Sequence, residues 1–135
     1  IGKKTNWGEI NLNTTAEFNF AEGQNSLDKE EPWYVMIYSP RIRSGNSLSI
    51  QYHKTTLSIN HHILAKRYTD ESNTELRALP SYQLVHFFLS REIKIKSVLS
   101  TLSCGADNIF DVRYESVRGY ALPGRVLTVQ FKITI

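Results

Sequence analysis

The chain has 135 residues, a net charge of +3 and a hydrophobic content of 41%. This length suits one domain with one core, and no apolar run reaches the 18 or so residues of a membrane-spanning helix. Lysine and arginine are scattered rather than gathered into a stripe, which argues against nucleic-acid binding.

Strict alternation predicts a half-buried strand over residues 9–20. Polar residues occupy one face of this segment, and the other face carries Ile10, Leu12, Thr14, Ala16, Phe18 and Phe20. Side chains alternate across a pleated strand, so a period of two over this length is typical of β structure. A helix would place Ile10 and Leu12 on widely separated faces.

The middle of the chain alternates between strand-like runs and turn signals. Aromatic and β-branched residues predict a strand over 33–38, and alternation predicts strands over 47–53 and 57–65. Residues 44–46 (Ser-Gly-Asn) predict a turn, and residues 69–74 predict a polar loop.

Residues 81–102 are harder to interpret. The run 82–89 is too apolar to show a period, and residues 92–102 begin as a strand but slip in phase near Ser97, which indicates a bulge. A short helix within 81–102 is the alternative, because Tyr82, Val85 and Leu89 also fit helical spacing.

The C-terminal segment returns to clear alternation. Residues 110–114 alternate, residues 119–124 predict a turn, and one face of the last strand carries Leu127, Val129, Phe131, Ile133 and Ile135. About eight short strands with a turn signal every dozen residues predict an all-β fold, a sandwich or a barrel. We expect the last strand to be integral to the sheet.

Chemistry-bearing motifs are missing from the sequence. It contains no Gly-x-Ser-x-Gly elbow, no His-Glu-x-x-His helix and no phosphate-binding glycine loop. His53, His61, His62 and His86 have no cysteine or carboxylate at zinc-like spacing. We therefore expect no enzyme activity, no metal and no cofactor. The single cysteine, Cys104, allows no internal disulfide, and we expect a buried or half-buried thiol.

The two ends of the chain resemble one family. Residues 6–8 (Asn-Trp-Gly) and the alternating side chains after them look like the donor strand of chaperone–usher fimbrial subunits of the colonisation-factor type. Residues 119–131 look like the same family's glycine- and proline-containing turn followed by a closing strand. The match covers about 30 residues, and the tyrosine near the C-terminus and the disulfide of many members are absent.

This resemblance implies a fold and a mechanism of assembly. The fold would be an immunoglobulin-like Greek-key β-sandwich of about seven to eight strands over residues 21–135, preceded by a donor segment over residues 1–20. The sandwich would lack one edge strand, which a periplasmic chaperone and then a neighbouring subunit would supply. The donor residues would be Ile10, Leu12, Thr14, Ala16 and Phe18, and the closing strand would carry Leu127, Val129, Phe131 and Ile133.

The implied protein is a structural and adhesive subunit of a bacterial surface fimbria. It would be secreted through the periplasm, attach to a host-cell receptor and contribute to virulence. The first residues carry no signal peptide, as expected of a mature protein that has lost its leader. The alternative is a self-contained secreted β-sandwich binding module, lectin-like or protein-recognising, in which residues 9–20 pair within their own domain.

Overall fold

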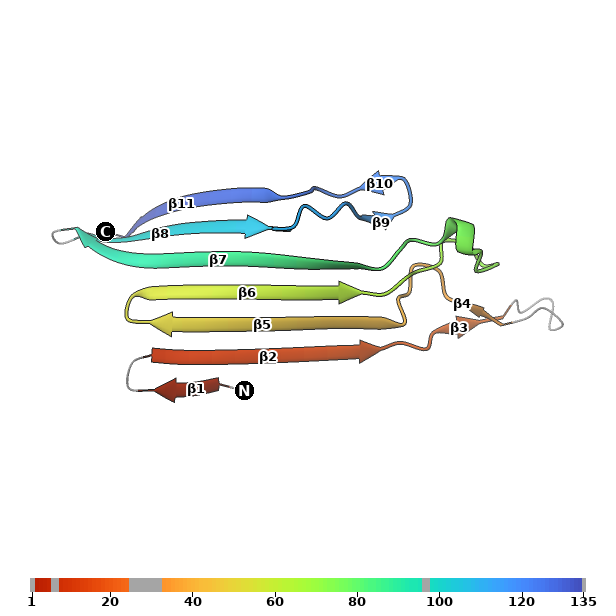
Figure 1. Ribbon diagram of the computed structural model, residues 1–135, viewed down its shortest axis with the longest axis horizontal. Coiled ribbons are helices and arrows are strands. Elements are labelled where there is room, and N and C mark those ends of the chain that lie inside the picture. The colour runs from red at the N-terminus through yellow and green to blue at the C-terminus, as the bar shows by residue number, and fades with distance from the viewer. Residues whose placement is uncertain (1, 6–7, 25–32, 96–97, 135) are drawn as a thin grey trace.

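The computed structural model of the protein, which describes residues 2–5, 8–24, 33–95 and 98–134, is dominated by one antiparallel sheet (Figure 1). Its seven strands lie in the order β1-β2-β5-β6-β7-β8-β11. Their bounds are β1 Gly2–Thr5, β2 Gly8–Phe18, β5 Ile42–Tyr52, β6 Thr55–Leu64, β7 Tyr82–Ile95, β8 Val98–Asp107 and β11 Val126–Thr134.

Three small elements lie at one end of this sheet. Two are two-stranded ribbons, formed by β3 (Glu22–Gly23) with β4 (Tyr34–Val35) and by β9 (Glu115–Val117) with β10 (Tyr120–Ala121). The third is η1, a 3₁₀ turn over Glu75–Arg77. Figure 1 shows all three beyond the same ends of the long strands, and none of them covers the middle of the sheet.

The all-β fold class is confirmed, and a seven-stranded antiparallel sheet with small accessory ribbons is consistent with a sandwich. The Greek-key order is wrong for the described residues. Strands β5 to β8 follow one another as a meander, and β11 lies beside β8 after the excursion through β9 and β10. A Greek key needs a long connection that returns a strand beside an earlier one. Short turns such as residues 53–54, where His53 has a φ of 49°, instead keep successive strands adjacent.

The short helix within 81–102 is also wrong. Residues 82–95 form β7, which pairs with β6 on one side and with β8 on the other. The apolar run 82–89 shows no clear period because large apolar side chains lie on both faces of the strand: Leu84 and Phe88 are on the face opposite Val85, Phe87 and Leu89. Tertiary pairing decides what the pattern alone left open.

Three finer expectations differ from the structure. The turn expected at 44–46 lies inside β5, where Gly45 pairs with Thr15 and His62. The strand expected at 33–38 is limited to β4, because residues 37–38 form a turn in which Tyr38 has a φ of 56°. The strand expected at 110–114 is a bend, because Asn108 and Asp111 adopt left-handed backbone.

Some expectations lie outside the described residues. These are Asn6 and Trp7 of the donor motif, Ser97 at the expected phase slip, and Ile135 at the end of the last strand.

The buried large aliphatic side chains lie where the accessory elements meet the sheet. Leu79 and Leu84 are 4% and 8% exposed, and they are the only strongly buried large aliphatic side chains in the described part of the chain. Arg67 beside them is 4% exposed, forms a backbone bridge with Leu79 and donates from a guanidinium nitrogen to the Glu115 carbonyl at 2.9 Å. The packed core therefore sits at one end of the sheet rather than along it.

Candidate functional site

One face of the main sheet carries two unbroken rows of apolar side chains. Residues directly opposite one another in an antiparallel sheet project to the same face, so the strand register defines each row. The first row is Leu12, Leu48, Ile59, Phe87, Ala106 and Leu127. The second row is Ile10, Ile50, Leu57, Leu89, Cys104 and Val129. We call the side of the sheet that carries these two rows the apolar face.

The opposite face is polar at the same levels. The row between the two apolar rows is Asn11, Ser49, Ser58, Phe88, Gly105 and Thr128. Phe88 is its one large apolar side chain. A sheet that is apolar on one face and polar on the other is built to cover its apolar face with another layer.

The apolar face is open in the described residues. Val129 is 77% exposed and Leu127 is 73% exposed, and Leu12, Leu102, Phe131 and Ile133 are also exposed. Figure 1 shows the long strands side by side, with no other element across their middle. Soluble chains rarely leave a continuous apolar surface of more than a few hundred Å² uncovered, and larger patches mark interaction sites.

The structure brings the two predicted groups of site residues onto this one face. The expected donor residues lie in β2 at one side of the sheet. Two of them, Ile10 and Leu12, begin the two apolar rows. The expected closing residues lie in β11 at the other side, and Leu127 and Val129 end the same rows. The two groups share a face but do not touch, because four strands separate them.

The two strands differ in their pairing. All eleven residues of β2 pair with β5, and β1 pairs with the first part of the other side of β2, so the expected donor segment is bonded within its own chain. In the described residues β11 pairs with β8 alone, so its outer side presents backbone groups without a strand partner. An exposed edge strand with apolar side chains is a template for pairing with another strand.

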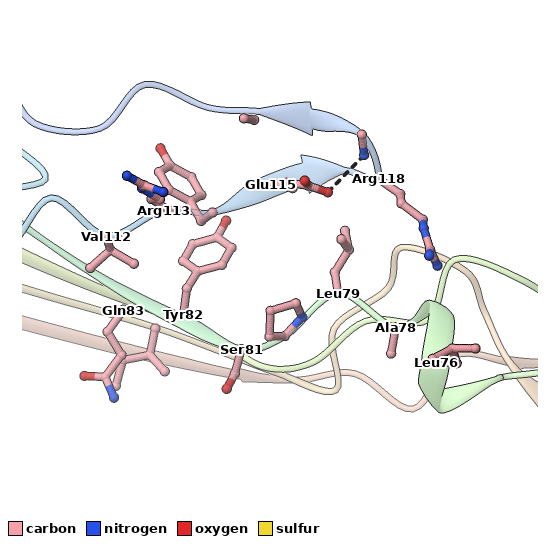
Figure 2. A pocket seen from close by; sticks show the side chains of 15 residues that line it. Leu76, Ala78, Leu79, Ser81, Tyr82, Gln83, Val112, Arg113, Glu115 and Arg118 are labelled. Carbon is pink, nitrogen blue, oxygen red and sulfur yellow. Dashed lines mark hydrogen bonds between the residues drawn. The ribbon is translucent and has the colours of Figure 1, made fainter.

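A second candidate site is a cavity of about 960 Å³ between the start of β7, the loop before it and the β9–β10 ribbon. Figure 2 shows Tyr82, Leu79 and Val112 among the side chains that line it, with Arg113 and Arg118 on the ribbon side. A mostly apolar cavity with a few polar groups is the usual form of a small-ligand site.

Aromatic rings build one wall of this cavity, and a buried cation lies next to one of these rings. The rings of Tyr82 and Tyr114 lie 4.6 Å apart, and the Arg67 guanidinium lies 5.1 Å from the Tyr82 ring. Burial, and then the nearby Tyr82 and Asp107, raise the pKa of Tyr114, so this phenol stays neutral and can donate or accept a hydrogen bond. The Glu115 carboxylate accepts from the Gly119 amide at 2.9 Å across the ribbon turn (Figure 2).

The four histidines do not form a metal site with other residues. His61 lies on the apolar side, and its Nε2 atom is 3.1 Å from Oε1 of Gln83, within hydrogen-bond distance. His62 faces the other way, 5.5 Å between ring centres from His86, and the Nδ1 atom of His86 lies 2.8 Å from Asp107. Across the described ranges, no group of three or more histidine, cysteine, aspartate or glutamate residues could hold an ion.

Cys104 is exposed in the structure, which corrects the expectation of a buried or half-buried thiol. The position of Cys104 in the second apolar row explains this exposure. Its neighbours in the row are Leu89 and Val129, so it has an apolar environment on the sheet, but nothing described covers that face.

Comparison with known proteins adds no assignment. The sequence matches no protein-family model, and no curated protein aligns with it significantly. In the part of the chain that the structure describes, no helix has the length and apolar character to cross a membrane. Sequence reasoning missed the cavity, because its wall combines Ile63 with two segments far from each other in the chain, residues 76–83 and 112–121.

Proposed function

We propose that the protein is a structural and adhesive subunit of a bacterial surface fimbria, assembled by strand addition between neighbouring copies. The observation that carries this proposal is the outer edge of β11. It offers nine residues of strand whose apolar side chains are exposed and whose outer side has no described partner. An added strand would gain main-chain hydrogen bonds along this edge and side-chain contacts on the apolar face.

The N-terminal segment is a suitable added strand. β2 has eleven residues against the nine of β11, and in both strands the apolar side chains lie on one face, with Thr14 of β2 as the polar exception. Every neighbouring pair in the sheet is antiparallel, so β2 and β11 run in opposite directions (Figure 1). A β2 segment from a copy in the same orientation would therefore meet β11 antiparallel.

Assembly would then be an exchange rather than a new fold. In a single chain β2 pairs with β5, and in a fibre the same backbone groups would pair with β11 of the next copy. This change of partner would replace the β2–β5 ladder with a β2–β11 ladder and would move the open edge from β11 to β5. A head-to-tail contact builds an open filament when the rotation between successive copies does not close into a ring.

A direct test adds a synthetic peptide of residues 6–20 to the full chain and measures the mass by size-exclusion chromatography with light scattering. We expect the chain to form species larger than a dimer, and excess peptide to shorten them and raise the melting temperature. A control peptide with Ile10→Asn and Leu12→Asn should do neither. A chain that never exceeds a dimer and ignores the peptide would overturn strand addition.

A second candidate function is a self-contained binding module. Two observations favour it: β2 pairs within its own chain, and the cavity of about 960 Å³ combines paired tyrosine rings with arginines. Aromatic rings with hydrogen-bonding groups suit sugars or peptides. Ligand-observed NMR with a panel of neutral and carboxylate-bearing monosaccharides tests it. Binding that is lost in Tyr82→Ala and kept in Tyr34→Ala, outside the cavity, would support this candidate.

A further inference from the structure

We propose that a second copy of this chain covers the apolar face, so that two sheets pack face to face as an intermolecular β-sandwich. This inference concerns the face of the sheet, and it stands independently of strand addition at the β11 edge. It assigns an occupant to the surface on which twelve apolar side chains lie in two rows across six strands.

The area of the face matches what a stable dimer needs. Six strands about 4.8 Å apart, each with about nine residues that rise about 3.3 Å, span roughly 850 Å². A standard stable interface buries about 800 Å² on each partner. One copy of the sheet therefore supplies enough surface for a complete interface without help from the accessory ribbons.

The total surface of the single chain points the same way. Its accessible surface is 10155 Å², whereas a compact monomer of 15.5 kDa exposes about 7,200 Å². The excess of roughly 2,900 Å² is too large to come from side chains scattered on a compact surface, and it is the expected result for a single layer with two solvent faces. A second layer removes one of those faces from water.

The chemistry of the face suits a copy of itself. Arg91 is the only Asp, Glu, Lys or Arg among the described positions that project to this side from β2, β5, β6, β7, β8 and β11. It lies near the β5–β6 turn, at the margin of the face, where its long side chain can reach water. A two-fold interface needs one self-complementary surface, and an uncharged apolar face is complementary to itself. A strongly charged partner would find no matching charge there.

Native Cys104 reports on the interface without any substitution. It lies in the second apolar row, one strand in from the β11 edge, and its thiol is exposed in the single chain. Face-to-face packing would bury it under the second sheet at about 10 Å layer spacing. An added strand beside β11 would leave it open, because that strand would lie beyond β11 rather than over the face.

The experiment measures mass by light scattering and the rate of thiol modification by a maleimide on the full chain, between about 0.1 µM and about 100 µM, a range that brackets micromolar dissociation constants. We expect a mass of twice 15.5 kDa, or a multiple of it, at high concentration. We also expect the thiol to react at least about tenfold more slowly there than in the dilute monomer, as the bound fraction in that range predicts.

Two substitutions at neighbouring positions distinguish the contribution of the apolar face from that of the polar face. Ile59→Glu places a charge at the centre of the apolar face, and Ser58→Glu places the same charge on the same strand but on the polar face. In a monomer both carboxylates face water, so both variants should keep the β-type circular dichroism spectrum. Ile59→Glu should abolish the dimer and restore thiol reactivity, because the interface would otherwise bury an unpaired charge. Ser58→Glu should change neither.

Three outcomes would overturn the proposal. A monomer with a fully reactive thiol at the highest concentration would mean that the face has no self-affinity. Larger species with a reactive thiol would mean association by edges alone, which would leave the strand-addition proposal standing. Protection of the thiol only after phosphatidylcholine vesicles are added would mean that a lipid surface covers the face.

Discussion

Asn108 stabilises the bend that follows β8, at the end of the sheet where the cavity lies. Replacing Asn108 therefore tests the structure of this region. Its side chain is 2% exposed and makes two bonds to one residue: its amide nitrogen donates to the Val112 carbonyl at 2.8 Å, and its carbonyl oxygen accepts from the Val112 amide at 2.9 Å. Its backbone is left-handed, with a φ of 48°. The two substitutions Asn108→Gly and Asn108→Ala separate these contributions.

The magnitudes follow from the two bonds and the backbone. Each lost bond of this kind costs roughly 1 kcal/mol, and more where the partner stays buried, so Asn108→Gly should lower the free energy of unfolding by about 2–3 kcal/mol. Glycine adopts positive φ freely, whereas alanine pays about 1–2 kcal/mol there. Asn108→Ala should therefore be the less stable variant, by about 1 kcal/mol after the greater flexibility of unfolded glycine is included.

Urea unfolding followed by circular dichroism measures this series, at a fixed protein concentration because association stabilises the folded chain. Asn13→Ala is the control, an exposed asparagine in the extended strand β2, and it should change stability by less than about 0.5 kcal/mol. Equal stability of the alanine and glycine variants would refute the left-handed backbone at Asn108. Stability of both within about 0.5 kcal/mol of the unsubstituted chain would refute the paired bonds to Val112.

Three further predictions test other parts of the molecule. Gly119→Ala should lower stability by about 1 kcal/mol in thermal melts, because Gly119 has a φ of 83° and a Cβ there would meet open space, so only backbone strain acts. Leu79→Ala should cost about 2–4 kcal/mol in urea unfolding, since Leu79 is 4% exposed and its removal leaves a void beside the cavity. Burial, then His86 and His61, lower the pKa of His62 from 6.5, so the folded chain binds fewer protons than the unfolded chain just below that pH. That contribution to stability is complete above pH 6.5 and is lost as the pH falls through the pKa of His62 in the folded chain. His62→Gln should therefore flatten this part of a plot of the urea midpoint against pH. An unchanged slope would contradict the lowered pKa.

Period-two alternation predicted the strands at both ends of the chain because the polar and apolar side chains of each strand lie on opposite faces. β2 and β11 begin and end within a few residues of their predicted bounds. Period-two alternation is lost where both faces of a strand carry large apolar side chains. In β7, Leu84 and Phe88 on one face add to Val85, Phe87 and Leu89 on the other, and the period disappears.

Turn residues misled in both directions because their conformation depends on the partner strand. Residues 44–46 have turn composition, yet β2 and β6 flank them, and Gly45 lets the Thr15 side chain approach its backbone closely. At 108–111 no glycine marks the bend, and asparagine and aspartate supply the left-handed backbone instead. The cavity could not be predicted from the sequence for a related reason. Tyr82 and Tyr114 are separated in the chain by the whole of β7 and β8, and only the pairing of these strands brings their rings together.

The open apolar face and the open β11 edge are separate properties of one sheet. Packing along the face uses side chains and leaves the backbone of β11 unpaired, whereas strand addition uses that backbone and leaves most of the face exposed. The two modes of association are therefore compatible, and a layered pair of sheets would still present a β11 edge from each copy. A sheet must bury its apolar face against another layer, and under our proposal a second copy of the chain would supply that layer. Thiol protection at Cys104 measures the layering and the peptide of residues 6–20 measures the edge, so each proposal can fail while the other stands.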